Sequence, residues 1–172
     1  MGGAYGGGGS FMKTGKISAA RVMKYVTLAA ILAFVIILML FMSGSTRPFD
    51  EVKEAVAESL DPDELTEQDG ARLKRDFGLN AADYSGVAYY SAESTISASE
   101  VLLIRVKDYE QIQTVLDAVG QRTESRMKDF ESYLPEQAHL LADARQSVRG
   151  AYVFYAVSPK AGEYLKAFSG SL

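Results

Sequence analysis

Few residues in this sequence are suited to catalysis or metal binding. His139 is the single histidine and there is no cysteine, so a histidine-containing triad or a zinc site would have to be built around one residue. Neither the HExxH nor the CxxC spacing is present. The sequence therefore predicts no catalytic residue, no metal site and no cofactor, and His139 is interpreted as a surface or half-buried residue.

An acidic run, Asp61, Asp63, Glu64, Glu67 and Asp69, raises the question of calcium binding. The run lacks the regular third acidic position and the turn glycine of an EF-hand loop. Acidic side chains also stabilise the start of a helix by interacting with its dipole. Helix-start electrostatics therefore explain the run without an ion.

Tyrosines offer another kind of site, because their rings can stack on sugars or peptides of a cell envelope. Tyrosine is also common in strands and at the rim of a core, so packing is the default interpretation. If one face of the predicted sheet is exposed, the candidate ligand-binding residues are Tyr89, Tyr90, Tyr152 and Tyr155.

A long apolar run, YVTLAAILAFVIILMLFM from Tyr25 to Met42, carries no charge. As a helix, a run of this length spans about 27 Å, close to the roughly 30 Å hydrocarbon core of a bilayer. We therefore expect one transmembrane helix within residues 21–46, in contact with membrane lipid. Its predicted anchor residues are Tyr25, Leu28, Ile31, Leu32, Val35, Ile36, Leu38 and Met42.

The charges on the two sides of this run differ in sign. Four basic residues precede it (Lys13, Lys16, Arg21 and Lys24), whereas all 22 acidic residues lie at or after Asp50. The positive-inside rule places the amino terminus in the cytoplasm and the acidic body outside. An acidic body also lacks the clustered cations that nucleic acid binding requires.

These features predict a flexible Gly-rich cytoplasmic tail over residues 1–20, the transmembrane helix over residues 21–46 and an extracytoplasmic domain over residues 47–172. A cleaved signal peptide would show the same order of charge and apolar run, and Ser43-Gly44-Ser45 offers small residues for a peptidase. Its apolar core is normally about 7 to 15 residues, which is shorter than this run, so an uncleaved anchor is favoured.

Helical spacing alternates with strand patterns in the outer domain. Apolar positions three and four apart predict helices from Pro48 to Leu60, from Thr66 to Gly78 and from Tyr109 to Tyr133, with shorter helices after Pro135 and Pro159.

Three strands are expected. The first follows Ser85-Gly86, and the second covers 101–106 near a sheet edge because Arg105 and Lys107 alternate with apolar residues. The third covers 151–157 and is apolar on both faces, as a central strand is. This order predicts an α+β fold of two layers, with helices on a small, mainly antiparallel sheet.

Four sequence blocks in the outer domain together resemble a known family. They are FGLNAADYSGVAYY (77–90), EVLLIRVKD (100–108), FESYLPEQAHLL (130–141) and VRGAYVFYAVS (148–158). Together they resemble the bacterial family catalogued as domain of unknown function 4358. The resemblance implies a lipoprotein or membrane-anchored extracytoplasmic protein, and it implies no activity. This chain lacks the lipobox cysteine of many relatives and has the run from Tyr25 to Met42 instead.

Our first hypothesis is a non-enzymatic, single-pass membrane protein whose outer domain binds another envelope protein or a cell-wall component. A second is an envelope hydrolase, which predicts two acidic side chains converging in a cleft. A third is a structural or assembly subunit of an envelope complex, which predicts a large exposed apolar patch.

Overall fold

The computed structural model describes residues 1–3, 27–35 and 47–172, and the chain divides into the units Met1–Met42 and Ser43–Leu172. Residues 27–35 form a helix in which Leu28, Ile31, Leu32 and Val35 are exposed. Of the predicted anchor residues, Tyr25, Ile36, Leu38 and Met42 lie outside the described residues, as does most of the predicted span. No helix within the described ranges is long and apolar enough to cross a membrane.

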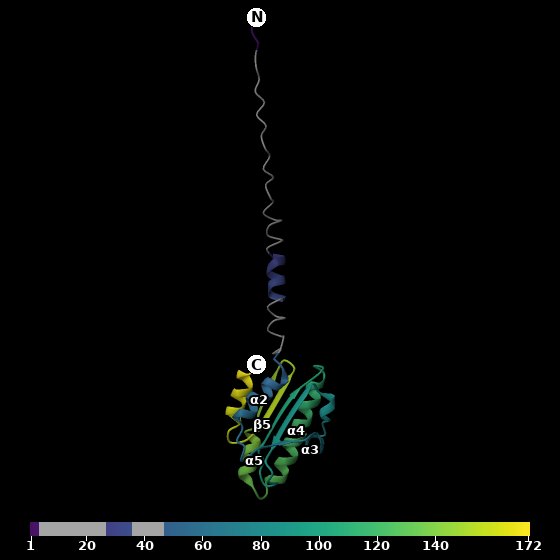
Figure 1. Cartoon of the computed structure of the whole chain (residues 1–172), viewed down its shortest axis with the longest axis vertical. Helices are drawn as coiled ribbons and strands as arrows, with labels where there is room; N and C mark the ends of the chain where they lie inside the picture. The colour runs from purple at the N-terminus through teal and green to yellow at the C-terminus, as the bar shows by residue number, and fades with distance from the viewer. Residues whose placement is uncertain (4–26, 36–46) are drawn as a thin grey trace. The chain divides into compact units, whose positions relative to one another are not determined.

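The second unit is built on a five-stranded sheet in which every neighbouring pair is antiparallel, with the strand order β1-β2-β3-β5-β4 (Figure 1). The α+β prediction is therefore confirmed. The strands are β1 (Thr66–Gln68), β2 (Gly86–Ser91), β3 (Glu100–Arg105), β4 (Arg145–Arg149) and β5 (Tyr152–Val157).

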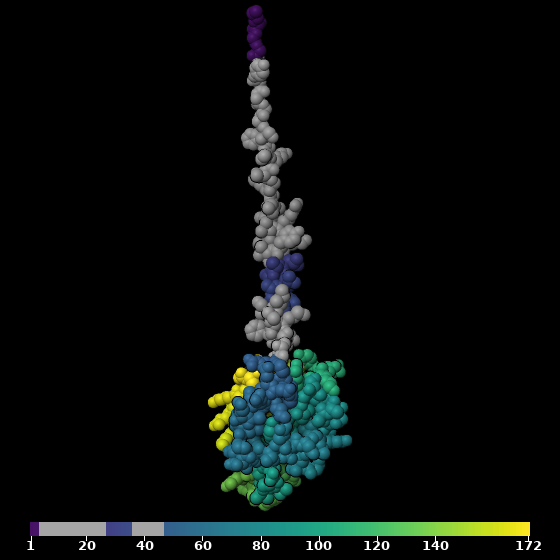
Figure 2. All heavy atoms as spheres, viewed as in Figure 1, coloured from purple at the N-terminus to yellow at the C-terminus, as the bar shows by residue number. Residues whose placement is uncertain are grey.

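Helices cover both faces of this sheet. On one face lie α3 and α4, with α5 at the end of α4, and on the other lie α2 and α6 (Figure 1). The atoms of α2 (blue) and α6 (yellow) lie beside each other in the space-filling view (Figure 2). The helices are α2 (Phe49–Ser59), α3 (Gly70–Phe77), α4 (Gln111–Phe130), α5 (Pro135–Ala142) and α6 (Ala161–Gly170).

The alternation of side chains along the strands explains why both faces need a cover. In β3, Leu102 and Ile104 pack toward α3 and α4, whereas Val101 and Leu103 pack toward α2 and α6. Since successive strand residues point to opposite faces, an all-apolar strand must be buried on both. The domain therefore has three layers, and the two-layer arrangement expected from the sequence is wrong.

The helix predicted from Thr66 begins four residues later. Thr66–Gln68 form β1 and pair with the edge of β2, while the Asp69 side chain accepts a hydrogen bond from the Arg72 amide and caps α3. Gly70 is the first residue of that helix and not an interior one. The predicted end is confirmed, because Gly78 adopts the left-handed conformation that a helix C-terminus favours.

Two strand placements also differ from the predictions. The strand expected near an edge, β3, is the middle strand, with β2 and β5 on its two sides. The edge strand β4 was not predicted at all, because its RQSVR sequence is mostly exposed on both faces and so has no apolar alternation. The strand β5 is buried throughout, as its apolar sequence predicts.

Candidate functional site

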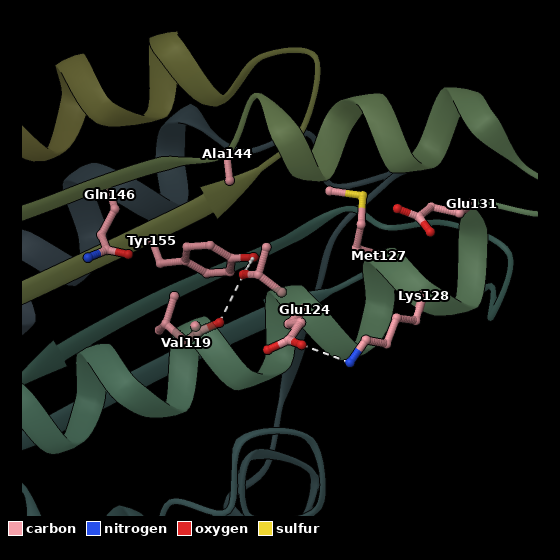
Figure 3. Close-up of a pocket in the computed structure, with 10 residues that line it drawn as sticks. Val119, Glu124, Met127, Lys128, Glu131, Ala144, Gln146 and Tyr155 are labelled. Atoms are coloured by element: carbon pink, nitrogen blue, oxygen red, sulfur yellow. Dashed lines mark hydrogen bonds and ion pairs between the residues drawn. The ribbon is translucent and has the colours of Figure 1, made fainter.

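An open groove lies between α4 and the strands β4 and β5. The strand β4 lies at the edge of the sheet, beside the strand β5. The groove between α4 and these two strands has a volume of about 510 Å³. Figure 3 shows the side chains of α4 on one wall and Ala144, Gln146 and Tyr155 across from them. This α4–β4 groove is lined by Val119, Gly120, Thr123, Glu124, Met127, Lys128, Glu131, Ala144, Gln146 and Tyr155.

Polar contacts hold the groove floor in place. The Thr123 hydroxyl donates to the Val119 carbonyl oxygen, and the Tyr155 hydroxyl lies 2.8 Å from Thr123 Oγ1. Since threonine has one hydroxyl proton, Tyr155 donates in the second bond. Burial raises the pKa of Tyr155, so the phenol stays neutral at physiological pH. The floor is therefore a fixed and uncharged surface.

Charged side chains stand at the outer wall of the groove. Glu124 and Lys128 form an ion pair of 2.7 Å one helical turn apart, and the exposed Glu131 follows directly after the last residue of α4 (Figure 3). An apolar floor with a charged rim suits recognition of an amphipathic ligand. Along this groove, carboxylates and hydroxyls form no arrangement of nucleophile and base.

The four candidate tyrosines do not form one surface. Tyr89 and Tyr155 lie on the sheet face covered by α3 and α4, whereas Tyr90 and Tyr152 lie under α2 and α6. All four are buried, because helices cover both faces of the sheet at these positions. Of the four, Tyr155 lines the α4–β4 groove.

A second polar site, the buried ion cluster, joins four elements. It consists of Asp76 at the end of α3, Tyr89 on β2, Glu100 on β3 and Arg122 on α4. The Tyr89 hydroxyl lies 2.9 Å from Asp76 Oδ2 and 3.2 Å from Glu100 Oε2. Arg122 Nη2 lies 3.0 Å from Glu100 Oε2 and 3.7 Å from Asp76 Oδ2. Two carboxylates thus converge on one guanidinium and one phenol.

The environment keeps Asp76 ionised. Burial by itself raises the pKa of Asp76, but hydrogen bonds from Arg72, Tyr89 and Arg75 outweigh burial and hold the pKa below its ordinary value of 3.8. Burial alone would lower the pKa of Arg122. The negative charge of Glu100 and its hydrogen bonds with Arg122 outweigh burial, so the pKa of Arg122 lies above its ordinary value. The ionised and paired side chains of the cluster therefore connect α3 and α4 to the strands β2 and β3.

The buried ion cluster was not predicted from the sequence, although one signal for it exists. Glu100 lies on the same face of β3 as Leu102 and Ile104, and its side chain is 3% exposed. A carboxylate on a face that is otherwise apolar must have a buried partner, since an unpaired buried charge is very costly. The sequence does not identify that partner, because Arg122 is 22 residues away.

We expect Asp76 to make the stability of the domain depend on acidity. The folded-state pKa of Asp76 lies below the unfolded value near 3.8, so its contribution is present above about pH 5 and is lost as pH falls through 3.8 toward the folded pKa. Asp76→Asn removes this contribution. We therefore expect Asp76→Asn to have a lower free energy of unfolding than wild type at pH 7, and we expect this difference to be smaller at pH 3. Urea unfolding of the full chain in detergent measures both values.

Asp129→Asn is the matched control, because Asp129 is exposed on α4. The gap between wild type and this control should stay small at both pH values. A gap between wild type and Asp76→Asn that is unchanged from pH 7 to pH 3 would contradict the proposed role of Asp76.

The remaining candidates from the sequence are His139 and the acidic run from Asp61 to Asp69. His139 is exposed on α5. The acidic run is dispersed: Asp61 pairs with Lys160, Glu67 pairs with Lys53, and Asp69 caps α3. The two ion pairs join separate segments of the domain, and the Asp69 contact stabilises the start of α3.

Comparison with known proteins identifies one family. A family model described as Domain of unknown function (DUF4358) matches residues 58–158, which is more than half of the chain. This match includes both the α4–β4 groove and the buried ion cluster. The chain matches no curated protein and no solved structure.

Proposed function

The chain belongs to the DUF4358 family, and on that premise we propose that it is a single-pass membrane protein whose residues 47–172 form a non-enzymatic binding domain outside the bacterial cytoplasmic membrane. Its proposed binding site is the α4–β4 groove, and its proposed ligand is a peptide segment of another envelope protein. A cell-wall component is the alternative ligand.

Charge and hydropathy support the anchoring. The run from Tyr25 to Met42 is uncharged and follows four basic residues, and the acidic residues all come after it. Basic residues stay on the cytoplasmic side of a membrane helix, so this order favours an external domain.

The α4–β4 groove is the observation that carries the binding role. It is about 510 Å³ in volume, within the usual range for ligand sites, and its floor includes apolar surface of Val119, Met127 and Ala144. Beside it, the edge strand β4 offers backbone groups that no other strand pairs within residues 47–172. A peptide can use both features, whereas a sugar uses only the groove.

The buried ion cluster favours a second candidate, an envelope hydrolase. Asp76 and Glu100 converge beside a cleft of about 120 Å³, as that hypothesis predicts. A hydrolase of this kind needs one carboxyl group as an acid and another as a base. Asp76 is held ionised by three hydrogen-bond donors, so the acid would have to be Glu100. The Glu100 side chain is 3% exposed and is paired with Arg122 at 3.0 Å; this pairing favours its charged form, and we therefore favour binding.

Protease protection on intact cells tests the proposed topology. Added protease should degrade residues 47–172 while leaving the amino-terminal tail protected, because the membrane shields the cytoplasmic side. Mass spectrometry should find the amino terminus uncleaved. Degradation only after the membrane is broken would contradict an external domain, and an amino terminus beginning near Ser43 would show a cleaved signal peptide.

A further inference from the structure

We infer that β4 binds an extended peptide as an added strand, and that this peptide carries acidic residues at alternate positions along one face and apolar residues along the other. This inference rests on the proposed function, since it names the ligand of the α4–β4 groove. It follows from the open edge of the sheet, from two arginines on β4 that have no carboxylate partner within residues 47–172, and from the position of the groove beside them.

The outer edge of β4 is available for backbone pairing. β4 has five residues, contains no proline and pairs with β5 on one side only. In an edge strand, half of the backbone N–H and C=O groups point away from the sheet. The opposite edge of the sheet is β1, which has only three residues. Of the two edges, β4 is therefore the better template for an added strand.

Two arginines give this edge a charge preference. Arg145 and Arg149 are exposed, and within residues 47–172 neither has a carboxylate partner. They pair with Ala156 and Tyr152 of β5, so both lie on the sheet face covered by α2 and α6. Residues directly opposite them in an added strand lie on that same face, where opposite charges attract. Acidic residues four positions apart would match both arginines.

The other face of β4 leads into the groove. Gln146 and Val148 pair with Tyr155 and Val153 of β5, which places them on the face of α4. Val148 is 39% exposed, and Gln146 lines the side of the groove opposite α4. Apolar side chains on the alternate positions of an added strand would cover Val148 and extend toward the groove. Pairing by main chain with pockets for alternate side chains is a known mode of peptide recognition.

A second copy of this chain fits the edge poorly. If two β4 strands paired antiparallel about Ser147, Arg145 of one copy would lie opposite Arg149 of the other. Like charges directly opposite each other destabilise a strand pair. An acidic peptide removes this repulsion, which is why we commit to a peptide from a different protein.

Binding of a synthetic peptide tests the inference. The probe is a fluorescent nine-residue peptide that alternates glutamate and valine, added to the full chain in detergent, with affinity measured by fluorescence anisotropy. Three control peptides keep its length: one groups the glutamates at one end, one has lysine for glutamate, and one is N-methylated at alternate amides. We expect each control to bind at least tenfold more weakly than the probe.

Substitutions in the protein test the β4 edge and the α4–β4 groove separately. Arg145→Glu with Arg149→Glu should weaken probe binding at least tenfold, whereas the matched charge reversal Lys74→Glu with Lys166→Glu, at exposed helix positions, should not. Gly120→Phe fills the groove, and its added side chain meets no neighbouring atom at Cβ. Gly162→Phe on α6 is its control, because that glycine is equally unobstructed. Circular dichroism checks that each variant is folded.

The outcomes distinguish this inference from the proposed function. Loss of binding on N-methylation and on reversal of Arg145 and Arg149 supports strand addition. Binding that is lost only in Gly120→Phe overturns strand addition and leaves the groove as the site. If no substitution alters binding of the probe, both strand addition to β4 and the α4–β4 groove as the binding site are overturned. Absence of any probe binding overturns the inference, and the groove is then judged by cross-linking in cells.

Discussion

Replacing Arg122 by methionine is expected to lower the free energy of unfolding by about 3 to 5 kcal/mol, the range for breaking a buried ion pair from one side. Arg122 lies between Glu100 and Asp76, whose side chains are 3% and 8% exposed. Methionine retains much of the apolar volume, but it leaves Glu100 without its cation. The loss therefore comes mainly from an uncompensated charge.

Arg75→Met is the matched control for this prediction. Arg75 also pairs with Asp76, at 3.1 Å, but its side chain is 62% exposed, so the expected loss is at most about 1 kcal/mol. Urea unfolding of the full chain in detergent, followed by circular dichroism, measures both losses. In the double variant Glu100→Gln with Arg122→Met, part of the loss should be recovered because the unpaired charge is removed. Equal losses for Arg122→Met and Arg75→Met would contradict the structural role of the cluster.

Phe168→Ala is expected to lower the free energy of unfolding by a similar amount, about 3 to 5 kcal/mol. Phe168 on α6 is fully buried and stacks on Phe154 of β5 with ring centroids 4.9 Å apart and planes inclined by 12°. Its ring also lies in an edge-type arrangement with the ring of Tyr152, with centroids 6.4 Å apart. Alanine removes these contacts and leaves a cavity between α6 and the sheet, which a close-packed core cannot fully close.

Tyr109→Ala serves as the control for loss of an aromatic ring. Tyr109 is 60% exposed at the start of the α4 region, so its removal should change the free energy of unfolding by less than about 0.5 kcal/mol. The comparison uses the same unfolding measurement. A Phe168→Ala variant as stable as Tyr109→Ala would show that α6 does not form part of the core.

Long periodic elements of this fold could be predicted from the sequence. The apolar spacing of Ile112, Val115 and Val119 identifies α4, and the apolar run of β5 identifies a strand covered on both faces. The helix end at Gly78 follows from the left-handed conformation that glycine adopts. In each case the local pattern and the tertiary environment agree, which is why the prediction is confirmed.

The missed elements lack such a local pattern. β1 has three residues and depends on pairing with β2, and β4 is polar because it lies at an edge. The buried ion cluster and the α4–β4 groove each unite residues distant in the chain, such as Asp76 with Glu100 and Thr123 with Tyr155. Strand order decides these contacts, and strand order is not encoded in any one segment.

Site-specific photo-cross-linking from Gln146 in intact cells tests the central claim, that the α4–β4 groove is a peptide-binding site outside the membrane. A photoreactive side chain at this position lines the side of the groove opposite α4. We expect an adduct with one segment of an envelope protein, identified by mass spectrometry, which disappears in Gly120→Phe and persists in Gly162→Phe. The same adduct in all three proteins, or no adduct in any of them, would contradict it.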